Sequence, residues 1–446
     1  MNWNPTWICP ANDLGDPAAV FGTSFVFEKK ITHANLTITA MGVYEARLNG
    51  RRVGQFVMAP GWTSYHKRLQ YQKYDITDLL TNDKNEIEVT VGKGWYRSPL
   101  PGWLGCAYQD ELRSRPCGLA AQITLTFEDG SSKILSTDES WKVSDGPVRF
   151  SEIYDGEIYD STKTPLLDQP VTIFDGPTDT LILQQGEEVC EQERLAVKKV
   201  FVTPNGETVL DFGQNMTGYV ELFVNAKVGD CVDLSFAEVM DKDGNFYTEN
   251  YRGAKAQYHY ICRDGVQTWH PSLTFYGFRY IRINDFPGGI DCVKPENFTA
   301  ITVHSNMKRT GFLSSSNTLL NQLFSNIIWG QKGNFLDVPT DCPQRDERLG
   351  WTGDAQIFCR TATYLMNTYT FYKKWLRDLE VDQTPEGGVP HVVPNIEEGR
   401  TDGNWLLSQG PHSAAAWADA AIINPWTMYL MYGDKDILKK QYGLRH

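Results

Sequence analysis

This sequence of 446 residues lacks several features, and each absence narrows the class of protein it can be. The nine cysteines are scattered, with no CxxC pair and no Cys/His cluster, which disfavours a disulfide framework and a structural zinc site. No stretch approaches the ~20 consecutive apolar residues of a membrane-spanning helix. The N-terminus has no basic region followed by an apolar one, as a secretory signal would, and no repeat of ~20–50 residues is visible. We therefore expect a cytoplasmic protein with reduced thiols and no membrane partner.

Positive charge is also in short supply. The chain has 42 Lys and Arg against 55 Asp and Glu, a net charge of −13, which argues against a nucleic-acid partner because such binding needs a basic surface. Aromatic residues are plentiful instead: 13 Trp, 21 Tyr and 21 Phe. Flat amphipathic rings suit the apolar faces of sugars. The composition favours a multidomain protein that handles an uncharged ligand.

Short alternating runs predict β structure in the first two thirds of the chain. Residues 36–40 and 86–91 alternate between turn signals such as Asn49-Gly50, and residues 219–224 and 280–283 continue the pattern. Many short strands with regular turns are typical of sandwiches and jelly rolls rather than of βαβ units.

After the Ser/Asn run at 314–317 the periodicity becomes helical. Apolar residues at 320, 323, 324, 327 and 328 lie on one helix face, and residues 371–379 and 414–432 predict two further helices. The sequence therefore predicts a multidomain chain: two antiparallel β-sandwich or jelly-roll domains over residues 1–190 and 191–307, then an all-α domain over 308–446.

The densest chemical signal is the segment 337–354, between two predicted helices. Five carboxylates, two arginines and a tryptophan lie within it, interrupted by two prolines and two glycines. Crowded carboxylates raise one another's pKa, and a carboxyl that keeps its proton near neutrality can act as a general acid. If the chain from Glu347 is helical, Glu347, Trp351 and Asp354 share one face, as a glycosidase subsite would need. An acidic, solvated helix N-terminus is an equally good interpretation of the spacing alone.

A family resemblance favours the glycosidase. The run DVPTDCPQRDERLGWTGDAQ (337–356) resembles the signature of the bacterial α-L-rhamnosidase family, and GVYEARLNGRRVG, LDFGQNMTGYVEL and AAAWADAAIINPWTMYLMYGDKDIL resemble other parts of it in the right order. The resemblance implies that the helical domain is the N-terminal part of an (α/α)6 barrel, the six-hairpin glycosidase fold. It also implies inverting hydrolysis of terminal α-L-rhamnosyl linkages, without metal or organic cofactor.

The resemblance assigns roles to individual positions. Glu347 matches the general acid, with Asp346 as the alternative that the motif register disfavours. Asp341 and Arg345 match positions that hold the sugar hydroxyls, Trp351 matches an aromatic wall, and Asp354 matches a further acidic position. The expected partner is a carbohydrate or a rhamnosylated small molecule; the aglycone, the linkage and the oligomeric state are left open.

Three other features have two interpretations each. Trp417 and Asp419 could form a second aromatic wall and a hydroxyl acceptor, although Trp417 could equally be a core residue. Cys342 has no neighbouring His to activate it and is better interpreted as a small buried thiol. The run 151–160 has four carboxylates and two tyrosines and could bind sugar, or calcium through its oxygen ligands, but a solvated turn is favoured.

The end of the sequence departs from the family pattern. Twelve helices of ~11–12 residues need roughly 140 residues before any loop, more than the chain has after Gly311. The general base of the family, a glutamate far downstream, is expected to be absent, so we expect an incomplete enzyme with little activity of its own and exposed apolar helix faces. The alternatives are a non-catalytic carbohydrate-binding remnant and another specificity on the same scaffold, such as an arabinopyranosidase.

Overall fold

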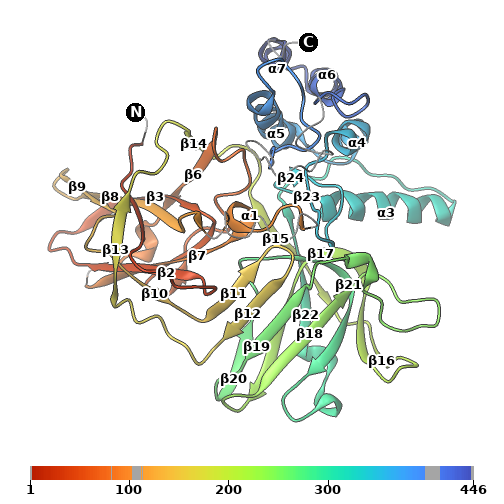
Figure 1. Cartoon of the computed structure of the whole chain (residues 1–446), viewed down its shortest axis with the longest axis horizontal. Coiled ribbons are helices and arrows are strands. Elements are labelled where there is room, and N and C mark those ends of the chain that lie inside the picture. The colour runs from red at the N-terminus through yellow and green to blue at the C-terminus, as the bar shows by residue number, and fades with distance from the viewer. Residues whose placement is uncertain (1–2, 82, 103–111, 113, 397–411, 443–446) are drawn as a thin grey trace.

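The computed structural model describes residues 3–81, 83–102, 112, 114–396 and 412–442. Two curled β sheets lie beside each other, and the helices pack at one end of the pair (Figure 1). This confirms the predicted architecture of two sandwich-like β domains followed by a helical domain. None of the described helices is long and apolar enough to cross a membrane.

Within the described residues the first sheet has twelve strands, in the order β14-β6-β3-β8-β1-β13-β10-β2-β7-β4-β5, with β9 paired to β8. The strands predicted at 36–40 and 86–91 lie within β3 and β7. The members of the sheet are β1 (Trp7–Pro10), β2 (Ala19–Phe25), β3 (Ile31–Met41), β4 (Val43–Leu48), β5 (Arg51–Arg52), β6 (Leu69–Asp75), β7 (Asn85–Gly92), β8 (Gly118–Phe127), β9 (Ser132–Ser136), β10 (Lys142–Asp145), β13 (Gln169–Phe174) and β14 (Leu181–Leu183).

The second sheet has ten strands in the described residues, in the order β11-β12-β19-β18-β21-β17-β22-β15, with β16 and β20 paired to β17. Its members are β11 (Val148–Glu152), β12 (Gly156–Asp160), β15 (Val189–Ala196), β16 (Lys199–Val202), β17 (Thr208–Ala226), β18 (Cys231–Ala237), β19 (Gln257–Ile261), β20 (Gly265–Trp269), β21 (Tyr276–Asp285) and β22 (Phe298–Ser305).

One hairpin crosses between the two β regions. β11 and β12 precede β13 of the first sheet in sequence, yet they form the edge of the second sheet, where β12 runs parallel to β19. Gly156 makes this pairing possible, because it has φ +94 and a Cβ there would lie 2.1 Å from the carbonyl oxygen of Gln257. The hairpin ties the two sheets together.

The helical region contains α3 (Thr318–Asn334), α4 (Thr352–Leu365), α5 (Tyr369–Asp382), α6 (Ala420–Tyr432) and α7 (Lys435–Gln441), while the short α1 (Gly94–Arg97) belongs to the first β region. Asn317 caps α3 through its side chain, which accepts from the backbone N–H groups of Leu319 and Leu320. The predicted face of α5 is confirmed, because Phe371, Trp375, Leu376 and Leu379 are all buried.

Two helical predictions were less accurate. On α3 only Ile328 of the predicted apolar face is fully buried, and Leu320 and Leu323 are exposed. The third helix begins at Ala420 rather than Ala414, because Ser413 and Ala416 take positive φ angles that interrupt it.

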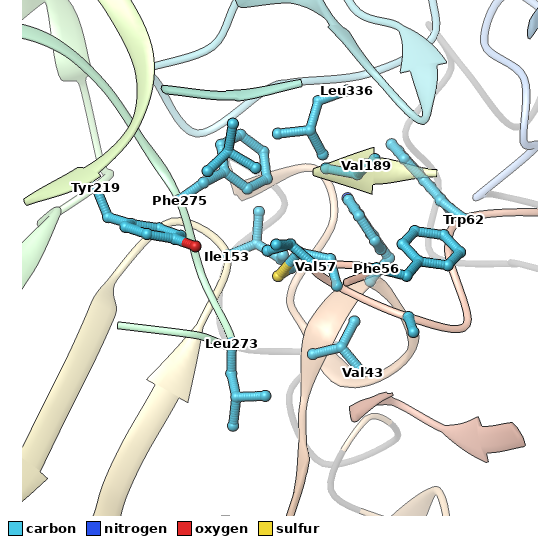
Figure 2. Packing of buried hydrophobic residues seen from close by; sticks show 14 of the residues in the cluster. Val43, Phe56, Val57, Trp62, Ile153, Val189, Tyr219, Leu273, Phe275 and Leu336 are labelled. Carbon is cyan, nitrogen blue, oxygen red and sulfur yellow. The ribbon is translucent and has the colours of Figure 1, made fainter. Parts of the chain in front are cut away.

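A continuous apolar core joins the β regions and the helices. Figure 2 shows Trp62 and Phe56 of the first region beside Leu336, with Tyr219 and Phe275 of the second region across the same core. Each fully buried side chain of this size contributes ~1.5–3 kcal/mol relative to exposure. The position of the helices is therefore fixed by both β regions.

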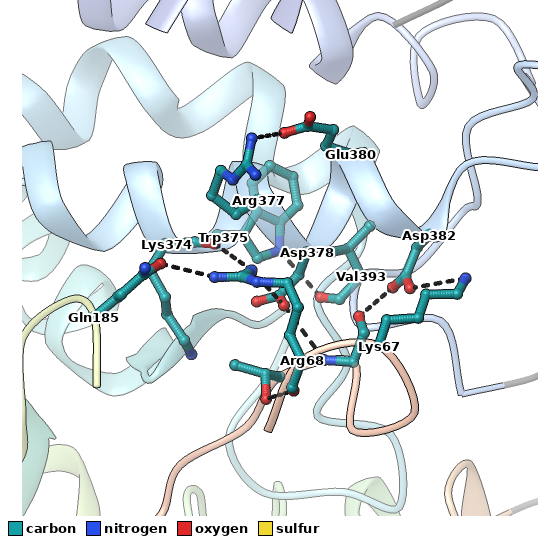
Figure 3. A network of polar contacts seen from close by, with 12 residues as sticks. Lys67, Arg68, Gln185, Lys374, Trp375, Arg377, Asp378, Glu380, Asp382 and Val393 are labelled. Atoms are coloured by element: carbon teal, nitrogen blue, oxygen red, sulfur yellow. Dashed lines mark hydrogen bonds and ion pairs between the residues drawn. The ribbon is translucent and has the colours of Figure 1, made fainter. Parts of the chain in front are cut away.

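A polar network strengthens the contact between α5 and the loop before β6. Arg68 donates to Asp378 at 2.7 Å and to Gln185 at 2.8 Å, and the Ser64 hydroxyl donates to Asp382 at 2.6 Å (Figure 3). Burial raises the pKa of Asp378 to about 7, against the opposing effect of Arg68. This network is almost wholly excluded from water.

Beside that network, Lys374 of α5 holds the segment that leads into the motif. Its Nζ donates to the Asp337 carboxylate at 2.7 Å and to the Trp62 carbonyl at 2.6 Å. Asp337 has φ +67 and connects the two-residue strands β23 (Phe335–Leu336) and β24 (Val338–Pro339). The first β region therefore sets where the motif begins.

Candidate active site

The motif forms a loop between β24 and α4, and Arg348 anchors it. Arg348 is buried. Its backbone has φ +50, a left-handed conformation that costs ~1–3 kcal/mol. It donates at 2.8–3.1 Å to four backbone carbonyls, those of Ile153, Phe275, Gln344 and Arg345. Because Ile153 lies in the β11–β12 turn and Phe275 directly precedes β21, these bonds fix the loop against the second sheet.

Glu347 lies at the centre of the site and is 9% exposed. Its Oε1 accepts from the Trp351 indole N–H at 3.0 Å, and its Oε2 accepts from Arg345 Nε at 2.8 Å and from Arg252 at 3.1 Å. Charge-assisted bonds of this kind orient a carboxyl strongly. The side chain is therefore held in one position by two arginines and an aromatic ring.

Asp341 shares Arg345 with Glu347. Its Oδ2 accepts from the other arm of the Arg345 guanidinium at 3.1 Å, and its Oδ1 accepts from the Leu349 N–H at 2.9 Å. Burial, reinforced by the negative charge of Glu347, raises the pKa of Asp341 to about 6. The structure thus brings together the three predicted residues Asp341, Arg345 and Glu347.

Asp346, the alternative acid, is directed elsewhere. Its carboxylate accepts from Arg252 Nε at 2.7 Å and from the Gly253 N–H at 3.2 Å. Arg252 therefore bridges the two neighbouring carboxylates, and of these two it is Glu347 that accepts from Arg345 and Trp351. This geometry supports Glu347 rather than Asp346 as the group that faces the aromatic wall.

The prediction that Glu347, Trp351 and Asp354 share one face of a helix was wrong. α4 begins only at Thr352, because Arg348 has a positive φ and the backbone of Gly350 pairs with that of Val393. A Cβ on Gly350 would lie 2.0 Å from the Val393 carbonyl oxygen, so no other residue fits there. Trp351 reaches Glu347 from the loop, not along a helix face.

Asp354 lies in the first turn of α4, and burial raises its pKa. Trp417 lies nearby, since a Cβ on Gly353 would come within 2.9 Å of its ring. Trp417 precedes α6 and is 38% exposed, so it is not a core residue. The fold therefore places a second aromatic ring beside Gly353, at the start of α4.

Asp419 lies in another environment. It precedes α6 and lines a cleft with Trp426 and Gln441, residues of α6 and α7. Among the described residues no hydrogen bond or ion pair joins it to the Glu347 cluster, and its role as a hydroxyl acceptor stays a prediction.

Cys342 is buried, and its sulfur accepts from the Arg348 N–H at 3.4 Å. Burial raises the pKa of its thiol, which disfavours the thiolate needed for nucleophilic attack. Asp341, Cys342 and Glu347 offer possible metal-ligand atoms within 4.8 Å of one another. Arg345 already supplies positive charge to both carboxylates, so this donor set is a poor fit to a cation.

Two contributors were missed by sequence reasoning. Arg252 comes from the second β region, some hundred residues before the motif, and Tyr154 of the β11–β12 hairpin donates its hydroxyl to the Glu347 carbonyl at 2.6 Å. Neither belongs to a local motif with Glu347. For Tyr154 the available signal was the run 151–160, in which it lies. The favoured interpretation of this run as a solvated turn was wrong, because Glu152 and Glu157 are buried.

Three family models match almost the whole chain. The bacterial alpha-L-rhamnosidase N-terminal domain matches residues 29–193, the concanavalin-like domain matches 201–304, and the six-hairpin glycosidase domain matches 308–444.

Curated and solved relatives agree. An alpha-L-rhamnosidase of Formosa agariphila is 36% identical over 439 residues, covering 94% of this chain and 45% of that protein. The crystal structure of the enzyme from Aspergillus terreus superposes with a TM-score of 0.90 at 39% identity, covering 98% of this chain and 51% of that one. The Streptomyces avermitilis enzyme, solved in complex with L-rhamnose, gives a TM-score of 0.86 at 37% identity, with coverage of 95% and 41%.

The chain thus spans about half the length, or less, of these relatives. Over that span the order of the matched domains and the fold agree with those relatives. The chain belongs to the bacterial α-L-rhamnosidase family of glycoside hydrolases.

Proposed function

We propose that this chain supplies the acid half of an inverting α-L-rhamnosidase site, which cleaves terminal α-L-rhamnosyl linkages. The observation that carries the proposal is the Glu347 carboxyl, fixed between Arg345, Arg252 and the Trp351 indole in a chain of this family. A fixed carboxyl beside an aromatic wall is the arrangement that a glycosidase needs for proton transfer to the departing oxygen.

The remaining residues would each contact a different part of the sugar. Asp341 and Arg345 offer an acceptor and donors for ring hydroxyls, and the rings of Trp351 and Trp417 offer apolar walls for the sugar face that carries the C5 methyl group. Asp354, in the first turn of α4, adds a further carboxyl. The ligand expected from this set is uncharged, because each carboxylate of the Arg345 group already has a cationic partner.

Inversion also needs a general base that activates water on the opposite sugar face, with the two carboxyls ~6.5–9.5 Å apart. The family resemblance implies that this base is not among the 446 residues. We therefore propose that the chain by itself binds L-rhamnose but hydrolyses rhamnosides weakly or not at all.

The first experiment measures p-nitrophenol release from p-nitrophenyl α-L-rhamnoside by the purified chain, alongside calorimetric titration with L-rhamnose. We expect the chain to bind L-rhamnose and to turn the substrate over at well under a tenth of the rate of a full-length relative. A rate within tenfold, which is a difference under ~1.4 kcal/mol in activation free energy, would contradict the absence of the base.

The second experiment tests the acid in the same protein fused to, or mixed with, the remaining part of a relative's helical domain. Glu347→Gln should lower turnover by ~10²–10⁴ and change L-rhamnose affinity little, since a neutral amide keeps the size but cannot give the proton. Asp346→Asn is the matched control from the neighbouring carboxylate. A larger loss of turnover in Asp346→Asn would reassign the acid.

A further inference from the structure

Cys342 is a buried thiol, 5% exposed, to which the proposed reaction assigns no role. Burial and the neighbouring Asp341 carboxylate raise the pKa of the thiol well above its ordinary value. The sulfur therefore keeps its proton throughout the neutral range, and a protonated thiol is a weak hydrogen-bond donor. Cys342 can thus supply a hydrogen bond to the site rather than a nucleophile.

The backbone of the motif loop brings this thiol beside the Asp341 carboxylate. The Arg348 N–H donates to Cys342 Sγ at 3.4 Å. The next N–H along the chain, that of Leu349, donates to Asp341 Oδ1 at 2.9 Å, and the Asp341 N–H donates in turn to the Leu349 carbonyl at 3.1 Å. Because Arg348 anchors this loop, the thiol lies between the anchor and the carboxylate predicted to hold a sugar hydroxyl.

The proton of the thiol is directed at Asp341. Cys342 Sγ, an Asp341 carboxylate oxygen and a Glu347 carboxylate oxygen lie within 4.8 Å of one another, and a side-chain hydrogen bond joins the thiol to Asp341. Burial and the charge of Glu347 raise the pKa of Asp341 to about 6, and the bond from the thiol opposes this rise. The thiol therefore stabilises the charged form of Asp341.

This bond also determines how many acceptor sites Asp341 has left. A carboxylate offers roughly four lone-pair sites to donors. Arg345, Leu349 and the Cys342 thiol each donate to one of them. The remaining site can accept from a sugar hydroxyl, and a charged carboxylate is a stronger acceptor than a protonated one.

Other titratable and charged groups surround this pair and its partners. Two of them act on Asp341 in opposite directions, since Glu347 raises its pKa and Arg345 lowers it. Cys342 is uncharged, so replacing it changes a hydrogen bond without changing the net charge of the site. The further groups are Arg348 of the same loop, Tyr154 of the β11–β12 hairpin, Glu238 and Arg252 of the second β region, and Asp354 of α4.

We propose that Cys342 is a positioning residue, whose thiol donates a hydrogen bond to the Asp341 carboxylate and holds it as the acceptor for a hydroxyl group of the bound sugar. The inference rests on the proposed function, because Asp341 contacts the sugar only if the site binds L-rhamnose. It adds a residue that acts through Asp341 and does not itself touch the sugar.

Calorimetric titration of the 446-residue chain with L-rhamnose between pH 5 and 8 measures the effect on binding. In wild type the affinity should fall as the pH drops below about 6, where Asp341 takes up a proton. Uptake of one proton limits this fall to about 10-fold per pH unit.

Two variants at Cys342 separate the hydrogen bond from packing. Cys342→Ala removes the donor, so the pKa of Asp341 rises and the midpoint of the fall should move to higher pH by about half a unit or more. Cys342→Ser keeps a donor and should keep the wild-type midpoint or lower it. Cys359→Ala is the matched control, because it removes another fully buried thiol and should leave the midpoint unchanged.

Infrared spectroscopy observes the hydrogen bond directly and needs no stable alanine variant. The S–H stretching band of Cys342 is assigned as the difference between wild type and Cys342→Ser. The band should move to higher frequency as the pH falls through about 6, because a protonated Asp341 accepts a weaker bond. In Asp341→Asn the band should not respond to pH.

The outcomes distinguish this inference from the proposed function. Failure of wild type to bind L-rhamnose at any of these pH values would overturn the proposed function, while the infrared band still tests the thiol. An S–H band that does not respond to pH would overturn the role of Cys342. The same conclusion would follow from equal midpoints in wild type and Cys342→Ala, or from an equal shift in Cys359→Ala.

Discussion

Arg345 is the residue on which the geometry of the site most depends. Its planar guanidinium reaches Glu347 with Nε and Asp341 with a terminal nitrogen, so one side chain fixes two carboxyls. A lysine carries the same charge but has a single nitrogen and cannot reproduce this fork. The interaction therefore depends on shape as well as on charge.

Replacing Arg345 with lysine should weaken L-rhamnose binding by about 10-fold or more, because the two carboxyls lose their common donor. Calorimetric titration checks this. Arg360→Lys is the matched control, since Arg360 is an exposed arginine on α4. Equal affinities in wild type and Arg345→Lys would show that the guanidinium does not position the sugar.

Asp341 gives the chain a pH dependence of stability with a definite sign. In the folded chain its carboxyl keeps the proton up to a pKa of about 6, whereas an aspartic acid in an unfolded chain titrates near ~3.9. Between these values the folded state binds more protons than the unfolded state, so the free energy of unfolding falls as the pH rises.

Asp341→Asn should remove this fall. Urea denaturation at pH 4 to 7 should show that the stability of wild type minus that of the variant decreases up to about pH 6 and is constant above it. Asp243→Asn replaces an exposed aspartate and is the control. A difference that increases with pH would contradict the direction of the pKa shift.

At the scale of elements, a helix was predicted correctly from the sequence where the burial of one face determines the spacing of its apolar residues. The spacing of Phe371, Trp375 and Leu379 predicted α5 because burial on one side dictates that spacing. The start of α4 was not predictable, because it depends on Arg348, whose positive φ is held by carbonyls of distant β segments.

The same distinction explains what was found of the site. Asp341, Arg345, Glu347 and Trp351 lie in one short motif and were identified together. Arg252 reaches Glu347 only because the second β region packs against the motif loop, a long-range contact that leaves no pattern in the sequence around Arg252. The fold class was therefore recovered, while the residues contributed by other domains were not.

Lys374 offers a test of how α5 is attached to the first β region. Its side chain is 1% exposed and bonds to Asp337, which is itself buried. Lys374→Met should lower the free energy of unfolding by about 3–5 kcal/mol, because it leaves the Asp337 carboxylate buried without its cation.

Chemical denaturation monitored by tryptophan fluorescence measures this loss. Lys373→Met is the matched control on the neighbouring position, where the lysine side chain is 41% exposed and its ion pair is worth at most ~1 kcal/mol. Similar losses in the two variants would show that the buried pair carries no special weight.

At the scale of the whole molecule, the helical region presents large apolar side chains to solvent. Leu319, Leu320 and Leu323 on α3 are exposed, as are Ile422 and Trp426 on α6. Large apolar patches on the surface are uncommon on monomeric proteins and mark a contact surface or a tendency to associate.

The double variant Ile422→Gln/Trp426→Gln should reduce concentration-dependent association in size-exclusion chromatography and lower the binding of an apolar fluorescent dye. Thermal stability should change little, because these side chains are already exposed. Leu166→Gln replaces an exposed leucine of the first β region and should change neither measurement. Association that is unaffected by the double variant would place the contact elsewhere.

The hairpin shared between the sheets also bears on how the chain folds during synthesis. β11 and β12 leave the ribosome about a hundred residues before β19, the strand with which β12 pairs. Until then their outer edge has no partner, and an unpaired edge can join strands of other chains. Glu152, Asp155, Glu157 and Asp160 place four carboxylates on this one hairpin. These four carboxylates would thus repel unwanted strand pairing until the strands of the second sheet have been synthesised.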